Sequence, residues 1–362
     1  MFGVRHRVAS WWAAGLALAL VGVPFLVGVL FLAGGLLGAA SSSAQEVAGA
    51  EVVLQRQFVE AYRGGDIESA LRFGEELMAR QPQNAFVAYD LARLRAARGE
   101  HEVALEWLRR SASAGFAEVA IVTSDADLAQ VRESPEYPAI LDAMKANQAA
   151  AWRAFERRVA EHPPELRAPR RLDPEKPAPL ILALHGRGGR GGPMVQLWEV
   201  VARQAGAVLA VPEALHPYAR GFQWGSQEET AYQTLQAIEA AAAKYPIDRE
   251  CVVLMGFSQG GRRSISTAFR HPGAFAGVIV MGSAMDRETA FPDVPAAELP
   301  RFFFMVGGED GVVQRTRETS KRFAERGIAQ RLVVYPGLGH TFPQDHVRQM
   351  KRALRFVKTC GG

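Results

Sequence analysis

Six short apolar runs between residues 180 and 337 constrain the fold of this 362-residue chain more than any other feature. They lie at residues 180–186, 207–213, 251–256, 276–282, 301–307 and 330–337. Helical patterns are found at 226–245, from 259 to about 269, at 314–327 and at 344–359. Continuous apolar strands that alternate with helices are typical of a parallel sheet covered on both faces. We therefore predict an α/β domain over residues 180–362.

The first 44 residues have a different composition from the rest. A short basic start containing Arg5 and Arg7 precedes residues 11–40, which carry no charge. Ser42 and Ala44 then fit the small-x-small pattern of signal peptidase cleavage. The apolar run is also long enough to cross a bilayer once. We expect residues 1–44 to be a signal peptide or an N-terminal membrane anchor, with the rest of the chain exported to the periplasm or the exterior.

A repeat of 34 residues marks the region that follows. GDIESAL at 65–71 recurs as GEHEVAL at 99–105, with Gly, Ala and Leu at equivalent places. This is the period of tetratricopeptide repeats, in which each helical hairpin buries its apolar face against the next. We predict a tetratricopeptide-like domain over residues 45–160, through which a protein partner could bind. An ordinary helical bundle is the alternative.

Residues 161–179 contain six prolines, which favours a linker between the two domains. The formal net charge is +4, and no basic run is interleaved with aromatic residues. The sequence therefore gives no sign of nucleic-acid binding.

The segment GFSQG at 256–260 follows one apolar run directly and opens a helix. It matches G-x-S-x-G, a strand-to-helix turn that exposes the serine hydroxyl. Glycines are needed because larger side chains in so tight a turn would collide with neighbouring strands. The helix N-terminus also favours developing negative charge. Ser258 is therefore the predicted nucleophile.

A serine nucleophile needs a base, and position selects His340, which follows the last strand in PGLGHTF. The other histidines considered fit helical, capping, loop-orienting or repeat-domain positions: His346, His271, His185 and His101. The expected acid is Asp310 in GGEDGVV, with Glu309 as a neighbouring surface carboxylate. The order Ser, Asp, His along the chain is that of α/β-hydrolases.

Two backbone N–H groups are expected to hold the oxyanion: that of Gln259, next after the serine, and that of Arg187 in HGRGGRGG. Phe222 and Trp224 are pocket candidates, with ordinary packing as the alternative. Arg262 lies one helical turn after Ser258 and is a candidate for contact with an acidic substrate or an adjoining loop, with a structural salt bridge as the favoured alternative.

Arg263 falls on a polar helical stripe, and we expect it to be solvated or to face the other domain. The chain contains two cysteines, Cys251 and Cys360. The final helix is expected to return Cys360 to the end of the sheet where Cys251 begins its strand, so a disulfide between them is possible.

Residues from about 178 to 360 resemble α/β-hydrolases of the phospholipase/carboxylesterase and dienelactone-hydrolase-like group. The blocks LHGRGG, YPIDRECVVLMGFSQGG, RHPGAFAGVIVMG, GGEDGVV and GLGHTF occur in the group's order. The resemblance implies a serine carboxyl-ester hydrolase without a metal or organic cofactor, acting on a small-molecule ester, and carries over Ser258, Asp310 and His340 as the triad. Arg262 and Arg263 stand where the group has small residues. A serine peptidase acting on short peptides and a non-catalytic repeat-based binding protein are the alternatives.

Overall fold

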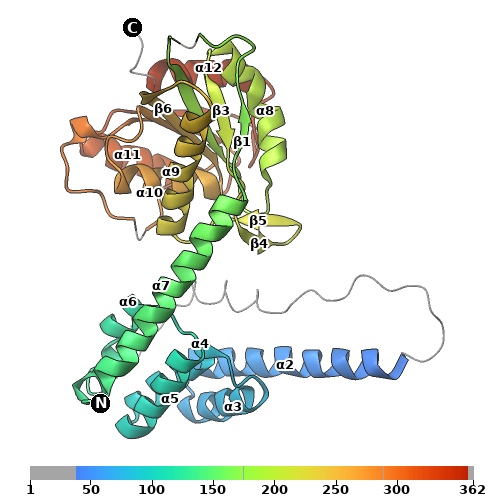
Figure 1. The fold of residues 1–362 in the computed structure, drawn as a ribbon, viewed down its shortest axis with the longest axis vertical. Helices are drawn as coiled ribbons and strands as arrows, with labels where there is room; N and C mark the ends of the chain where they lie inside the picture. The colour runs from blue at the N-terminus through green and yellow to red at the C-terminus, as the bar shows by residue number, and fades with distance from the viewer. Residues whose placement is uncertain (1–37, 174, 288, 358–362) are drawn as a thin grey trace. The chain divides into compact units, whose positions relative to one another are not determined.

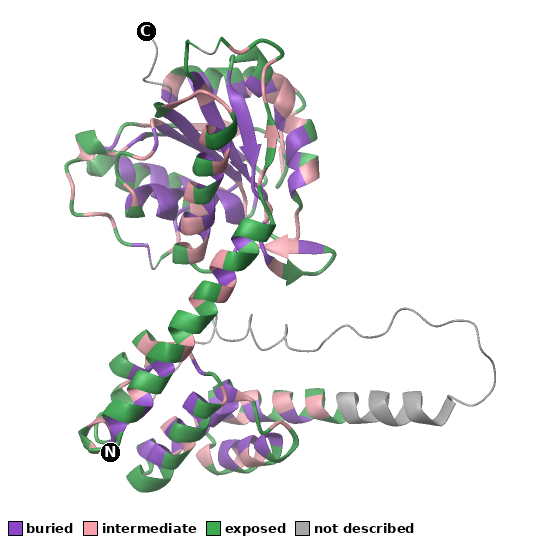
Figure 2. Ribbon diagram, in the orientation of Figure 1, coloured by how far each residue is buried: buried purple, intermediate pink, exposed green. Residues whose placement is uncertain are grey.

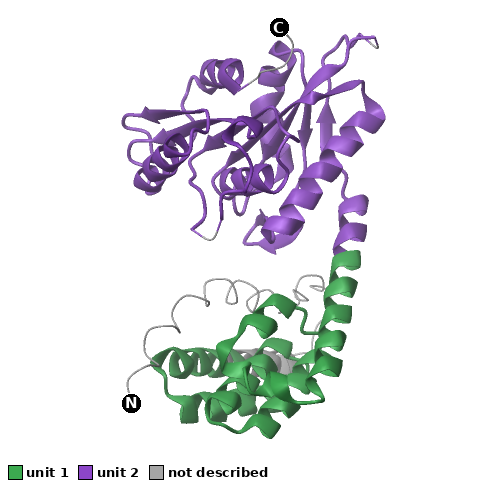
Figure 3. Cartoon of the chain, turned by 90° about the vertical axis from the view of Figure 1, so that its left-hand side faces the viewer, with its two compact units in different colours: residues 1–154 green, residues 155–362 purple. Residues whose placement is uncertain are grey.

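The computed structural model describes residues 38–173, 175–287 and 289–357, with side chains from residue 50 onward. The expected signal or anchor segment at 1–44 lies almost entirely outside these residues. Within the described part of the chain, no helix has both the length and the apolar character needed to cross a membrane. The chain divides into two compact units, residues 1–154 and 155–362 (Figure 3).

The described part of the first unit is helical (Figure 1). Its elements are α2 (Gly38–Gly64), α3 (Ile67–Arg80), α4 (Ala85–Ala97), α5 (His101–Ser113), α6 (Val119–Ser124) and the 3-10 turns η1 (Ala126–Leu128) and η2 (Val131–Glu133). Helix α7 (Tyr137–Glu161) begins in this unit and continues into the second. The unit's core includes the fully buried side chains of Phe58, Leu77, Leu91, Leu108 and Met144.

The same turn occurs twice in this unit, 34 residues apart. Gly65 and Gly99 have φ angles of 74° and 79°, which glycine adopts readily because it has no Cβ. The following residues donate equivalent backbone bonds, from Asp66 N to Ala61 O and from Glu100 N to Arg95 O, both 3.0 Å long. The sequence repeat thus corresponds to two helical hairpins, α2–α3 and α4–α5, with the same αL turn between their helices.

The second unit contains a seven-stranded sheet in the order β1-β3-β2-β6-β7-β8-β9. Its strands are β1 (Glu165–Arg167), β2 (Ala178–Leu184), β3 (Val208–Val211), β6 (Ile247–Phe257), β7 (Gly277–Met281), β8 (Arg301–Gly307) and β9 (Gln330–Tyr335). All neighbours pair in parallel except β1, which runs antiparallel to β3. The mostly parallel sheet predicted from the apolar runs is therefore confirmed.

Helices cover both faces of this sheet (Figure 1). Helices α9 (Gln227–Lys244), α10 (Gln259–Arg270) and α11 (Val313–Glu325) pack on one face, and α8 (Gly191–Gln204) and α12 (His346–Val357) on the other. Successive strand side chains alternate between the two cores: Leu180 and Leu182 lie in the first, Ile181 and Ala183 in the second. Burial on both faces explains why the strands read as continuous apolar runs (Figure 2).

Two small elements of the second unit differ from the sequence prediction. Residues 165–167, inside the expected linker, form the edge strand β1, and residues 216–223 form the hairpin β4 (His216–Tyr218) and β5 (Gly221–Gln223). Each of these strands has three residues, too few for a recognisable alternation. Tertiary pairing with β3, rather than local sequence, makes β1 a strand.

Two local predictions can be compared with the structure. Ser226 and Glu229 form the expected capping box at the start of α9, with Ser226 Oγ accepting from Glu229 N and Glu229 Oε2 from Ser226 N. Cys251 is buried near the start of the apolar part of β6 and is disulfide-bonded. Its expected partner, Cys360, lies outside the described residues, so that pairing stays a prediction.

The turn at Gly99 gives a test of the helical unit. Nothing lies within 4 Å of a methyl group placed on Gly99, so Gly99→Ala introduces backbone strain without a clash. We expect the variant to lower the free energy of unfolding by roughly 1–2 kcal/mol, as αL backbone costs for an L-residue. Gly99→Asn should lose less, since asparagine tolerates αL. Thermal unfolding followed by circular dichroism measures both, and equal stability of the Ala variant and the wild type would contradict the role of the turn.

Candidate active site

The carboxyl ends of β2, β6, β8 and β9 lie at one edge of the sheet, where parallel α/β folds bind ligands. The candidate nucleophile follows β6, the candidate acid follows β8 and the candidate histidine follows β9. The glycine-rich loop at 185–192 follows β2. The topology therefore brings to one edge four segments that are far apart in the sequence.

Ser258 occupies the turn between β6 and α10 with φ 52° and ψ −117°. A non-glycine residue in this region carries strain of roughly 1–3 kcal/mol. The turn is very tight: a methyl group on Gly256 would lie 2.3 Å from Gly260 O, and one on Gly260 would lie 2.4 Å from Leu184 O. These contacts are with backbone and cannot be relieved by a rotamer change. The two glycines of G-x-S-x-G are thus required for the backbone to pass β2 and enter α10.

Asp310 and His340 are in direct contact. His340 Nδ1 lies 2.7 Å from Asp310 Oδ2, and the ring of Phe257 packs on the imidazole with 4.8 Å between centroids. The Asp310 side chain is 3% exposed, whereas that of His340 is 44% exposed. Asp310 Oδ1 accepts a second bond of 3.0 Å from Val312 N. The carboxylate is therefore buried with both oxygens bonded, while the imidazole remains open to solvent.

Gly282 and Gly186 show how closely the loops approach Ser258 and its neighbours. A methyl group on Gly282 would lie 3.3 Å from both Asp310 Oδ2 and His340 Cε1. One on Gly186 would lie 3.3 Å from Ser258 Cβ. In the described part of the chain, no hydrogen bond involves the hydroxyl of Ser258.

The two expected oxyanion donors have free backbone N–H groups within the described residues. Gln259 is the first residue of α10, so its N–H has no partner within the helix. Neither its N–H nor that of Arg187 donates a hydrogen bond to another described residue. Arg187 follows Gly186, the residue that approaches Ser258. Its guanidinium carbon lies 5.4 Å from the ring centroid of Tyr218, in β4.

His185 organises the glycine-rich loop. It is 1% exposed, with Nδ1 2.7 Å from Gly186 O and Nε2 accepting from Ala214 N at 3.0 Å. Burial lowers its pKa, only partly opposed by the Gly186 carbonyl and the charge of Glu213. The neutral imidazole with hydrogen on Nδ1 fits both bonds. His185 therefore fixes the loop, as its position in the sequence suggested.

The pocket candidates have different surroundings. Trp224 is 2% exposed, belongs to the core and donates from Nε1 to His185 O at 2.7 Å. Trp224 therefore packs in the core, which was the alternative to a position in the pocket. Phe222 is partly buried and forms an antiparallel bridge with Gly189. Arg190 lies over its ring, with 5.0 Å from the guanidinium carbon to the centroid. Phe222 thus braces the glycine-rich loop.

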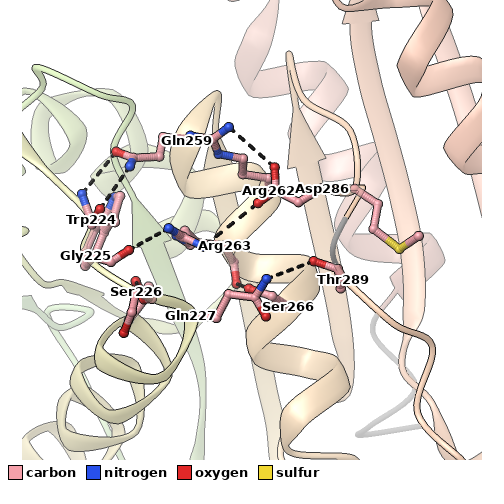
Figure 4. A network of polar contacts seen from close by, with 12 residues as sticks. Trp224, Gly225, Ser226, Gln227, Gln259, Arg262, Arg263, Ser266, Asp286 and Thr289 are labelled. Atoms are coloured by element: carbon pink, nitrogen blue, oxygen red, sulfur yellow. Dashed lines mark hydrogen bonds and ion pairs between the residues drawn. The ribbon is translucent and has the colours of Figure 1, made fainter. Parts of the chain in front are cut away.

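The two arginines after the serine both contact adjoining loops (Figure 4). Arg262 NH1 lies 3.4 Å from Asp286 Oδ1, so Arg262 forms a salt bridge with an adjoining loop, the alternative that the sequence favoured. Arg263 donates from NH2 to Gly225 O at 2.6 Å, and its side chain is 16% exposed. The expectation that Arg263 is solvated is therefore wrong, because α10 packs closely against the segment after β5. Sequence reasoning missed Asp286, which has no motif around it.

The remaining candidates make no hydrogen bond with Asp310 or His340 among the described residues. Glu309 is exposed, His271 caps the end of α10, His346 begins α12 against Trp198, and His101 begins α5 in the other unit. Within the described residues, no group of three or more His, Cys, Asp or Glu side chains is placed to hold a metal ion.

Residues 223–360 match the family model described as phospholipase/carboxylesterase. The match includes Ser258, Asp310 and His340 and begins after Arg187. No curated protein sequence matches the chain.

Similar solved structures include esterase PE8, with 21% identity, a TM-score of 0.43, and coverage of 54% of this chain and 99% of that one. A carboxylesterase from Bacillus cereus has 17% identity and a TM-score of 0.44, covering 55% and 96%. A phospholipase/carboxylesterase from Dyadobacter fermentans has 18% identity and a TM-score of 0.41, covering 54% and 96%. The family match supports an α/β-hydrolase domain in this region.

The lowered pKa of His185 predicts a pH dependence of stability. As pH falls below about 6.5, the unfolded chain protonates this histidine while the folded one does not, so stability falls until the folded-state pKa is reached. His185→Asn keeps a donor and an acceptor but does not titrate. We measure the free energy of unfolding in urea at several pH values between 7 and 5. Its slope against pH should be smaller in His185→Asn than in the wild type, by up to about 1.4 kcal/mol per pH unit. Equal slopes in the two proteins would contradict the neutral buried imidazole.

Proposed function

We propose that the second unit is a serine carboxyl-ester hydrolase that forms an acyl-enzyme on Ser258. The observation that carries the proposal is the 2.7 Å bond between buried Asp310 and exposed His340, at the same edge of the sheet as the strained turn of Ser258. This is the arrangement in which an imidazole is oriented by a carboxylate and left free to exchange protons. The phospholipase/carboxylesterase match over residues 223–360 supports ester rather than amide substrates.

In the proposed reaction, His340 takes the proton of the Ser258 hydroxyl on Nε2, because Nδ1 is engaged by Asp310. The Ser258 oxygen attacks the ester carbonyl and forms a tetrahedral oxyanion. His340 then gives its proton to the leaving alcohol as the carbon–oxygen bond breaks. A water molecule next gives a proton to His340, attacks the acyl carbon and releases the acid, and the proton returns to Ser258.

The oxyanion is held by the N–H groups of Gln259 and Arg187. Each such donor contributes about 3–4 kcal/mol to transition-state stabilisation in comparable sites. Both groups are unbonded to other described residues, so neither has to break a protein hydrogen bond to reach the substrate. The N-terminus of α10 adds a favourable potential at the same place.

Substitution of Ser258 tests the proposal directly. Ser258→Ala should abolish turnover of p-nitrophenyl butyrate, because the nucleophilic oxygen is absent, and should also prevent labelling by a fluorophosphonate. Circular dichroism and thermal unfolding control for loss of fold. Equal ester turnover by the variant and the wild type would rule out this nucleophile. Turnover of aminoacyl p-nitroanilides above that of esters would favour a peptidase instead.

Asp310→Asn tests the role of the carboxylate separately. The amide side chain nearly preserves shape but favours the wrong imidazole tautomer, so kcat should fall by about four orders of magnitude. Glu309→Gln is the matched control, since Glu309 is adjacent but exposed. Similar kcat values for these two variants would contradict the assignment.

We further propose that the first unit is built of tetratricopeptide-like repeats that bind a protein partner, and that the chain is exported. The repeated αL turns at Gly65 and Gly99 support the repeat assignment. A cavity of about 650 Å³ between α3 and α5 supports partner binding, with Met78, Pro82 and Trp107 among its lining residues.

The composition of residues 1–44 supports export. Export is tested by adding a protease to cells whose outer membrane has been permeabilised while the inner membrane is intact. An exported chain should be digested, and full protection of the chain would contradict export.

A further inference from the structure

Helix α12 covers one face of the sheet and has an outer side that is basic throughout (Figure 1). Its sequence, HVRQMKRALRFV, contains four Lys or Arg residues and no acidic residue. They stand at positions i, i+3, i+4 and i+7, which share one side of a helix: Arg348, Lys351, Arg352 and Arg355. All four are exposed, whereas the apolar side of the helix packs in the core.

Strand β9 extends this basic surface. Tyr335 donates from its hydroxyl to Gln349 Oε1 in α12 at 3.3 Å, so the strand lies beside the helix. Side chains alternate along a strand, and Val333 and Tyr335 both pack against the core that includes α12. Arg331 therefore stands on the same side of the sheet as α12, and it is exposed.

Strand β8 contributes one more cation. Arg301, its exposed first residue, donates from NH1 to Phe356 O in α12 at 3.4 Å. We call the six exposed residues from these three elements the basic face: Arg301, Arg331, Arg348, Lys351, Arg352 and Arg355.

Carboxylates neutralise little of the basic face. Asp345 pairs with Arg348, and the other five cations make no ion pair with a described residue. Helix α11 is different, because Glu318 and Glu325 are interspersed among its basic residues. The four cations of α12 span about 10 Å along the helix, close to the Debye length of about 8 Å at physiological salt. Their potentials therefore add, and the face attracts anions.

The composition of the basic face favours lipid headgroups over other polyanions. In the described part of the chain, the exposed large hydrophobic side chains lie elsewhere, on α2, α4, α5 and β4. A stable protein interface needs an apolar centre, and single-stranded nucleic acid needs aromatic side chains for stacking. A layer of anionic headgroups requires neither, because charge alone attracts clustered Lys and Arg residues.

We propose that the basic face is a docking surface for an anionic phospholipid bilayer. The helix binds by charge and does not insert, since its apolar side is already packed in the core. The six cations lie over the headgroups of the lipid surface. This interaction is separate from the ester hydrolysis proposed above and does not require it.

The test uses the full chain and follows acetylation of Lys351 by an N-hydroxysuccinimide ester, with mass spectrometry as the readout. Vesicles of phosphatidylcholine and phosphatidylglycerol in equal amounts should slow this reaction at least about fivefold, the effect of one cation at a charged surface. Vesicles of phosphatidylcholine alone should not slow it. Any insertion of residues 11–40 takes place on both kinds of vesicle and cancels in the comparison. Lys244, exposed on α9 at the other face of the sheet, is the internal reference.

Arg352→Gln/Arg355→Gln removes two charges of the basic face and keeps Lys351. It should lose about 25-fold in affinity for the anionic vesicles, about fivefold for each charge, so that the slowing becomes less than about twofold. Arg317→Gln/Lys321→Gln is the matched control, because it removes two charges from α11, on the other face of the sheet. Its Lys351 should be protected as in the wild type.

Equal acetylation of Lys351 on anionic and neutral vesicles would overturn the proposal. Equal loss of protection in the two double variants would also overturn it, because net charge rather than the basic face would then be responsible. Protection of Lys351 by a DNA duplex but not by anionic vesicles would assign the face to nucleic acid instead.

Discussion

The tight passage of the chain from β6 into α10 is the constraint on which the rest of the site depends. Gly256 approaches Gly260 O, and Gly260 approaches Leu184 O, at distances that leave no room for a Cβ atom. The backbone accordingly bends at Ser258 with a positive φ angle. This bend leaves the first N–H of α10 unbonded at the edge of the sheet and places Ser258 beside Gly186, in the loop that follows β2. Strain at one residue is thus balanced by packing of the sheet around it.

The site pairs a buried carboxylate, that of Asp310, with a solvent-exposed imidazole, that of His340. Asp310 is buried with both carboxylate oxygens bonded, which offsets the cost of removing a charge from water. His340 shares one of those bonds but is nearly half exposed. The carboxylate can therefore orient the imidazole without being accessible itself, and the imidazole can exchange protons at its other nitrogen. His185 is the opposite case, a buried neutral imidazole with both nitrogens engaged in backbone bonds.

Much of the fold could be predicted from local patterns, because those patterns are set by local physics. Continuous apolar runs predicted the strands of a sheet with both faces buried. The capping box at Ser226 and Glu229 predicted the start of α9. The edge strand β1 could not be predicted, since its three residues become a strand only by pairing with β3. The contact of Arg263 with Gly225 could not be predicted either, because it depends on how the segment after β5 packs against α10.

The sequence by itself determined the six apolar strands, the helices α9 to α12 and the candidate residues Ser258, Asp310 and His340, because glycine placement and apolar periodicity are properties of neighbouring residues. It also placed Arg262 and Arg263 in the first turn of a helix. Only the tertiary structure decided what those arginines contact. Asp286 comes to them from a loop after a different strand, and no local pattern in the chain specifies that approach. Contacts between segments distant in sequence arise from the packing of the sheet and its helices, so they are visible only once the chain is folded.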